Sequence, residues 1–85
     1  MSKNRRVELE RESERLEKEI VLLDKRRADL EERFALPAVS RDGKRVRALR
    51  AELEEIDREA TAALAAWESA VEALDADRAL ARSSQ

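Results

Sequence analysis

Residues 35–44 decide the fold, and their sequence is Ala35-Leu36-Pro37-Ala38-Val39-Ser40-Arg41-Asp42-Gly43-Lys44. Pro37 has no backbone N–H donor and disfavours helix at the residue before it, so a preceding helix is predicted to end near Phe34. Ser40 or Asp42 can cap a following helix, because either side chain can accept hydrogen bonds from unpaired backbone N–H groups. This segment therefore predicts a break between two helices.

Residues on both sides of the break follow the heptad repeat of a coiled coil. Before the break, alternating steps of four and three residues connect Leu9, Ser13, Leu16, Ile20, Leu23, Arg27, Leu30 and Phe34. After it, the same steps connect Val46, Leu49, Leu53, Ile56, Ala60, Ala63, Trp67, Ala70 and Leu74. The sequence predicts one helix over about 4–34, a loop over 35–42 and a second helix over about 43–80.

The two heptad patterns stay in phase when the second helix folds back along the first. Facing pairs then run in step from Phe34 with Val46 to Ser13 with Trp67, where a large side chain meets a small one, as in a well-packed seam. The predicted fold class is all-α, a two-helix antiparallel coiled-coil hairpin. We expect it to form a single domain over residues 1–85 and to be monomeric.

The composition argues against an enzyme. The 85 residues include no Cys and no His, which excludes disulfides and removes the commonest catalytic base and metal ligand. The sequence contains no Gly-rich phosphate loop and no nucleophile set beside a base. Most acidic residues fall on exposed helix positions, where they are solvated and spread apart. We therefore expect no catalytic residue, no metal site and no cofactor.

The first residues, Met1-Ser2-Lys3-Asn4-Arg5-Arg6, are basic, but no apolar stretch follows them. A secretory signal and a membrane span are therefore not expected. The sequence predicts a cytoplasmic location and no membrane partner.

The net charge of −2 conceals an uneven distribution along the second half of the chain. Positions 41–50 contain five basic residues and one acid, Asp42. Positions 52–77 contain nine acids and one basic residue, Arg58. Such an asymmetry is informative about partners rather than about the fold.

Cations gather at the loop end of the predicted hairpin. Arg26 is expected to pair with Glu52 across the helices, and Glu31 with Arg50. The loop end then keeps an unneutralised positive cluster, because only there do positive charges lack acidic neighbours. The predicted nucleic-acid-binding residues are Arg33, Arg41, Lys44, Arg45, Arg47 and Arg50. They would contact the phosphates of DNA or RNA without reading bases, whereas the alternative is a basic end that merely balances the acidic shaft.

Three other features have both a functional and a structural interpretation. Arg27 is either a ligand contact or a register device whose charged head reaches nearby acids, and we favour the second. Trp67 is either a stacking platform for a base or part of the core, and its seam position favours the core. Val21 and Leu22 lie off the seam, where they either dock on a partner or are ordinary exposed apolar residues.

Three stretches resemble the C-terminal coiled-coil domain of ABC-F ATPases, the duplicated ATP-binding-cassette proteins of translation and nucleic-acid metabolism. They are Ser2-Lys3-Asn4-Arg5-Arg6-Val7-Glu8-Leu9-Glu10 at the start, Arg15-Leu16-Glu17-Lys18-Glu19-Ile20 in the first heptads, and the spacing from Ser40 to Ala66-Trp67-Glu68 in the second helix. The resemblance covers about residues 2–75. The tRNA-contacting coiled coil of valyl-tRNA synthetases is also similar.

The resemblance implies an accessory domain that contacts DNA or ribosomal RNA through basic residues. The Walker A and signature motifs of the ATP-binding cassettes are absent from this sequence, so ATP hydrolysis would belong to parent ATPase domains. No motif of the family assigns individual residues to nucleic acid. The competing hypothesis is a protein-interaction or spacer coiled coil with no nucleic-acid role.

Overall fold

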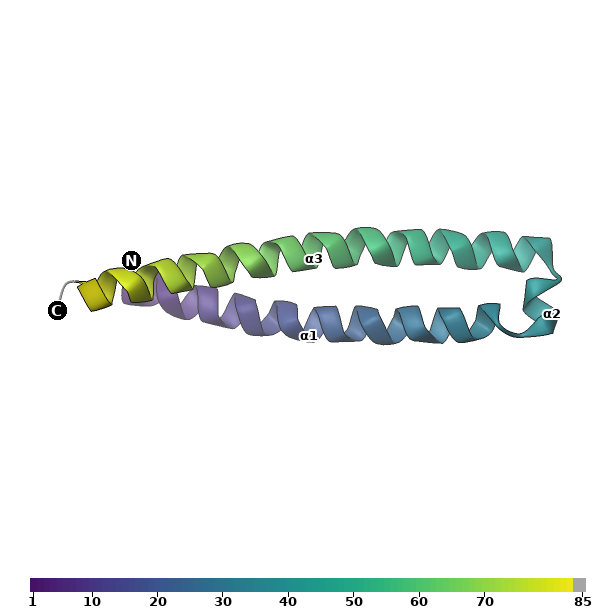
Figure 1. Ribbon diagram of the computed structural model, residues 1–85, viewed down its shortest axis with the longest axis horizontal. Coiled ribbons are helices and arrows are strands. Elements are labelled where there is room, and N and C mark those ends of the chain that lie inside the picture. The colour runs from purple at the N-terminus through teal and green to yellow at the C-terminus, as the bar shows by residue number, and fades with distance from the viewer. Residues whose placement is uncertain (84–85) are drawn as a thin grey trace.

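The computed structural model describes residues 1–83 and contains α1 (Lys3–Phe34), α2 (Pro37–Ser40) and α3 (Gly43–Ser83), as Figure 1 shows. No β-strand occurs in this described range. The molecule is a rod with principal extents of 65 × 19 × 15 Å. The all-α prediction is confirmed.

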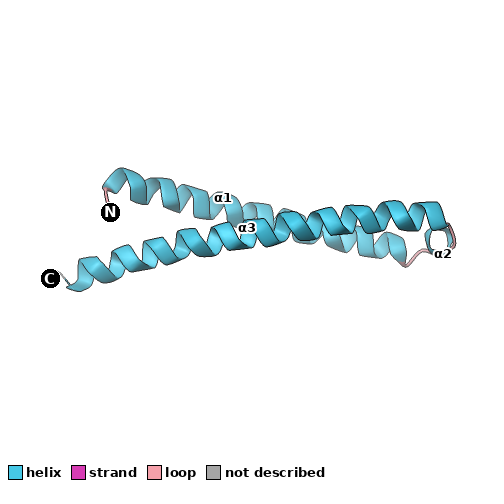
Figure 2. Cartoon of the chain, turned by 90° about the horizontal axis from the view of Figure 1, so that it is seen from above, coloured by secondary structure: helices cyan, strands magenta, loops and turns pink. Residues whose placement is uncertain are grey.

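The chain reverses its direction between the two long helices. Figures 1 and 2 both place the beginning of α1 and the last turns of α3 at the same end of the rod. At that end, Arg6 Nε donates a 2.8 Å hydrogen bond to Asp77 Oδ2. Nearer the middle of the rod, Arg27 forms an ion pair with Asp57. Contacts between residues so distant in sequence require α3 to run back along α1.

Side-chain caps define where both long helices begin. Ser2 Oγ accepts a 3.2 Å hydrogen bond from the backbone N–H of Arg5 at the start of α1. Asp42 Oδ1 accepts bonds of 3.1 Å and 3.3 Å from the N–H groups of Lys44 and Arg45 at the start of α3. Asp42 is therefore the cap of the second long helix, which decides between the two alternatives that the sequence leaves open.

The segment between the long helices differs from the predicted loop because it contains α2. Pro37 is the first residue of this short helix, where its fixed φ angle and missing donor cost nothing. Leu36 before it is extended, with φ −75° and ψ 126°. Val39 packs against the core. The linking segment thus closes the end of the rod, and the core continues into it.

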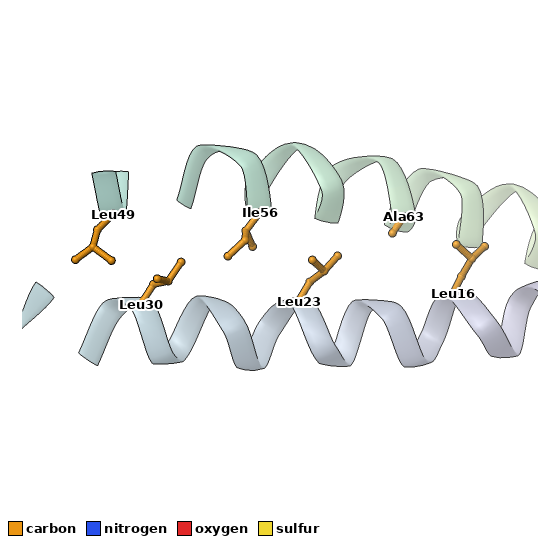
Figure 3. Packing of buried hydrophobic residues seen from close by; sticks show 6 residues of the cluster. All are labelled: Leu16, Leu23, Leu30, Leu49, Ile56 and Ala63. Carbon is orange, nitrogen blue, oxygen red and sulfur yellow. The ribbon is translucent and has the colours of Figure 1, made fainter. Parts of the chain in front are cut away.

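The same seam position is buried in every heptad between α1 and α3. The buried series comprises Leu9, Leu16, Leu23 and Leu30 on α1, and Leu49, Ile56, Ala63 and Ala70 on α3. Figure 3 shows six of these side chains meeting across the seam, with Leu30 and Leu49 nearest the linking segment. Burying one such leucine stabilises the fold by about 1.5–3 kcal/mol relative to leaving it exposed.

The other seam position is half-buried in every heptad but the last, where Leu74 is buried. This second series comprises Ser13, Ile20, Arg27 and Phe34 on α1, and Val46, Leu53, Ala60 and Trp67 on α3. A seam between two helices has no third element to cover its rim, so one series is enclosed while the other remains at the edge. The polar residues Ser13 and Arg27 occupy this second series, where water can still reach them.

Trp67 does not occupy the closed core position that its heptad place predicts. It is half-buried and packs against the main hydrophobic cluster, while its indole Nε1 donates a 3.1 Å hydrogen bond to Glu17 Oε1. Indole N–H groups need a partner, and the exposed rim of the seam supplies one. The packing role is therefore correct, but the degree of burial is lower than expected.

Candidate nucleic-acid interface

The six predicted binding residues lie together at the end of the rod where the chain turns. We call this region, residues 33–50, the tip. Its cations come from the last turn of α1, the residue after α2 and the first two turns of α3, and all six are exposed: Arg33, Arg41, Lys44, Arg45, Arg47 and Arg50. Against them the same range contains one acid, Asp42. The fold thus brings a dense positive charge to one end of a 65 Å molecule.

One of these cations has an acidic partner, which corrects the expectation that none does. Arg45 Nε lies 3.5 Å from Asp42 Oδ2. The pair follows from the cap, because the residue three positions after a capping aspartate lies on the same side of the first helical turn. Arg45 is exposed, so this ion pair contributes little to stability and leaves the guanidinium accessible.

The other five tip cations form no ion pair within residues 1–83: Arg33, Arg41, Lys44, Arg47 and Arg50. Arg47 extends over the start of α3, where its Nη1 would lie 3.4 Å from a Cβ atom placed on Gly43. The positive end of the α3 dipole adds to their charge at this point. The tip therefore offers several accessible cations that the fold does not use.

The two cross-helix pairs predicted next to the tip do not form. Arg26 and Glu52 line one shallow groove, which Asp29 also borders, yet they are not in ion-pair contact. Glu31 and Arg50 are not paired either, within the described part of the chain. Long exposed side chains gain little from holding one geometry in water, so facing positions alone do not ensure an ion pair.

At the opposite end of the rod, most of the cations are engaged within the fold, although Lys3 and Arg82 form no ion pair in the described chain. We call this end the open end, and it comprises residues 1–9 and 70–83. Asp77 is 9% exposed and accepts the hydrogen bond from Arg6, and the amino group of Met1 lies 3.4 Å from its other oxygen. Arg5 lies 3.4 Å from Glu8. The bond from Arg6 lowers the pKa of Asp77 below its ordinary value of 3.8.

Sequence reasoning missed Asp77, although a signal was present. Asp77 follows Ala70 by seven residues and so continues the buried series of α3 by one heptad. Burying an unpaired carboxylate costs free energy, so a carboxylate at a buried seam position predicts a cation opposite it. Arg6 on α1 is that cation.

Comparison with known proteins gives one match. A family model described as the ABC transporter C-terminal domain matches residues 6–72, which is well over half of the chain. The chain belongs to this family. Neither the curated proteins nor the solved structures give a significant match.

Membership of the ABC transporter C-terminal domain family confirms the resemblance at the level of a C-terminal domain of an ABC-type ATPase, and it makes the chain an accessory domain of an ABC protein. The matched range contains the whole tip and ends before Asp77. The tip therefore lies within the part of this chain that the family model matches.

The other candidate functional residues of this ABC transporter C-terminal domain are Arg27, Val21 and Leu22. Arg27 forms its ion pair with Asp57 of α3, so its charged head reaches an acid of the second long helix, as the register interpretation predicts. Val21 and Leu22 are 52% and 60% exposed on the outer face of α1.

No group of three or more acidic side chains within residues 1–83 is arranged to hold a metal ion. None of the helices there has an apolar stretch long enough to cross a membrane.

Proposed function

We propose that this chain is the antiparallel coiled-coil accessory domain of an ABC-F ATPase, and that its tip contacts the phosphate backbone of DNA or ribosomal RNA. The observation that carries the proposal is the contrast in charge use. Five exposed tip cations have no ion pair within residues 1–83 and share the range 33–50 with a single acid, Asp42. By contrast, Arg5 and Arg6 at the open end are engaged with acids, and the unpaired cations of the shaft, such as Lys18 and Lys25, have acidic neighbours in the sequence. This role belongs in the cytoplasm, the location that the sequence predicts.

Phosphate contact is the chemistry that suits an exposed cation cluster without aromatic residues. Each Lys or Arg that neutralises a phosphate releases condensed counterions, so affinity comes from charge and falls with salt. About three to five such contacts give weak binding, on the order of micromolar or weaker at physiological salt. The acids between positions 52 and 77 that have no ion pair repel the same polyanion and orient the rod tip-first.

A charge-reversal pair tests this proposal. Lys44→Glu with Arg47→Glu changes two unpaired tip cations, and the fold should persist because both side chains are exposed and an acid suits position 44 in the first turn of α3. We expect affinity for a labelled duplex to fall about tenfold or more at low salt, and the log–log salt slope to lose about 2 units. Fluorescence anisotropy against duplex DNA, single strands and structured RNA would measure both quantities and rank the three ligands.

The matched control makes the same charge change on the shaft. Lys18→Glu with Lys25→Glu alters two exposed cations of α1 that form no ion pair in the described chain. Its effect on affinity should be small compared with that of the tip variant. Equal losses from both variants would mean that overall charge, and not the tip, drives binding. If the unmodified chain binds none of the three ligands at low salt, the nucleic-acid role is wrong.

In that case the alternative function is a protein-interaction or spacer coiled coil. The exposed pair Val21 and Leu22, which with Glu14, Glu17 and Lys18 borders a shallow and largely apolar depression, favours it. A domain of the parent ATPase would be the first partner to test, by mixing it with the unmodified chain and with Val21→Ser, Leu22→Ser.

A further inference from the structure

Leu36 differs from the two other large apolar side chains near the chain reversal. Phe34 and Val39 are half-buried and pack against the core, whereas Leu36 between them is 54% exposed. Single exposed leucines are common on protein surfaces and need no explanation by themselves. What distinguishes this one is its place at the end of the rod, within the cation cluster.

The backbone around Leu36 is fixed by hydrogen bonds. Its N–H donates to the carbonyl of Arg33 at 3.1 Å, and its own carbonyl accepts bonds from Val39 N at 3.0 Å and Ser40 N at 2.9 Å. Pro37 restricts the next φ angle. A side chain attached to so constrained a backbone loses little freedom when it meets a ligand, so contact through it is less costly.

The charges around Leu36 select the chemistry of the ligand. Arg33 precedes it by three residues and Arg41 follows it by five, and both are exposed cations without an ion pair in the described chain. A matching ligand must present phosphates and an apolar surface side by side. Nucleic acid does so where a base is unstacked, because the base face is then accessible next to its own phosphates. Leucine and proline are among the side chains that proteins insert between base steps.

We propose that Leu36 is an apolar wedge that contacts an accessible base face, so that the tip prefers nucleic acid with an unstacked base to a continuous duplex. This inference rests on the proposed function and specifies its substrate class. The arginines would hold the phosphates, and Leu36 would occupy the gap that a bulge or a strand junction leaves.

The test compares a fully paired DNA duplex with the same duplex carrying one unpaired adenosine, by fluorescence anisotropy at low salt. The unmodified chain should bind the bulged duplex about fivefold more tightly, the size expected when roughly half a leucine side chain leaves water. Leu36→Ser should bind both duplexes alike. Serine is also favoured at the residue before a helix, so α2 should be retained.

Leu22→Ser is the matched control, because Leu22 is similarly exposed but lies on the shaft among mixed charges. It should keep the preference for the bulge. The wedge is wrong if the unmodified chain binds both duplexes equally, or if Leu36→Ser keeps the preference. Vesicles that contain phosphatidylglycerol provide a second kind of anionic surface. The wedge is also wrong if Leu36→Ser binds both duplexes as the unmodified chain does and loses binding only to these vesicles.

The two proposals fail in different ways. If the unmodified chain binds no nucleic acid, the proposed function and the wedge are both wrong. If it binds, and the Lys44→Glu, Arg47→Glu variant weakens binding while Leu36→Ser changes nothing, only the wedge is wrong. Circular dichroism of each variant would show that the helices persist.

Discussion

The two ends of the rod have similar numbers of cations nearby but use them differently. At the open end, Arg6 bonds to the buried carboxylate of Asp77, and Arg5 lies beside Glu8. At the tip, the only acid is Asp42, which caps α3 and holds Arg45. The first arrangement joins two helix ends that no loop connects. The second leaves charge available, because the chain itself already joins the helices there.

The seam shows the same contrast in its packing. Toward the tip, large residues meet large ones, as Leu30 and Leu49 do in Figure 3. Toward the open end the buried series of α3 consists of alanines, as Ala63 opposite Leu16 shows, and Leu9 packs with both Ala70 and Leu74. The buried series of α3 thus has smaller side chains where the helices are not tethered, so we expect the open end to depend more on Asp77. The comparison predicts that each buried side chain contributes less to the free energy of unfolding at the open end than near the tip.

The largest expected effect is a difference between two identical truncations. Leu30→Ala and Leu9→Ala remove side chains that are 4% and 5% exposed, near the tip and at the open end respectively. We expect Leu30→Ala to cost about 4 kcal/mol and Leu9→Ala about 2 kcal/mol, because an untethered end can relax around the cavity. Urea denaturation followed by circular dichroism would measure both. Equal costs would remove the proposed gradient.

Trp67→Ala should have an intermediate effect. Trp67 is the largest side chain of the seam on the open side, but it is half-buried, so we expect a loss of about 2 kcal/mol, below the range for a fully buried tryptophan. Trp67→Phe keeps a ring and loses the bond to Glu17, and should cost about 1 kcal/mol. Fluorescence emission should lie between that of free and fully buried tryptophan. Emission like that of tryptophan in water would contradict the packing.

The smallest effect concerns pH at the open end. Because the folded state lowers the pKa of Asp77, its ion pair with Arg6 stabilises the fold above pH 3.8. This stabilisation is lost as pH falls through the lowered pKa. Asp77→Asn should therefore be less stable than the unmodified chain at pH 7, and the difference in melting temperature should vanish in strong acid.

Asp75→Asn is the control for this pH dependence. Asp75 lies on the exposed face of α3, 3.8 Å from Arg78, and both side chains are largely solvated. Its replacement should change the melting temperature little at any pH. If both asparagine variants behave alike from neutral to acidic pH, the buried ion pair does not hold the open end together.

The heptads predicted the helices because spacing alone decides which residues can share a seam. They could not show that Leu23 is enclosed while Ile20 stays at the rim, since this depends on how two helices cover each other. Pro37 predicted the break, yet the same residue begins α2, because proline ends one helix as readily as it starts another. The tip cations were found from composition, whereas the bond between Arg45 and Asp42 depends on side-chain geometry.

The length of the rod has a mechanical consequence. The rod is 65 Å long and 19 × 15 Å across. A rigid rotation of about 5° at the open end would displace the tip by about 6 Å, roughly the rise of one turn of an α-helix. A protein that binds the open end can therefore move the tip by several ångströms through a small rotation. Such a rotation would change which distant surface the tip arginines contact.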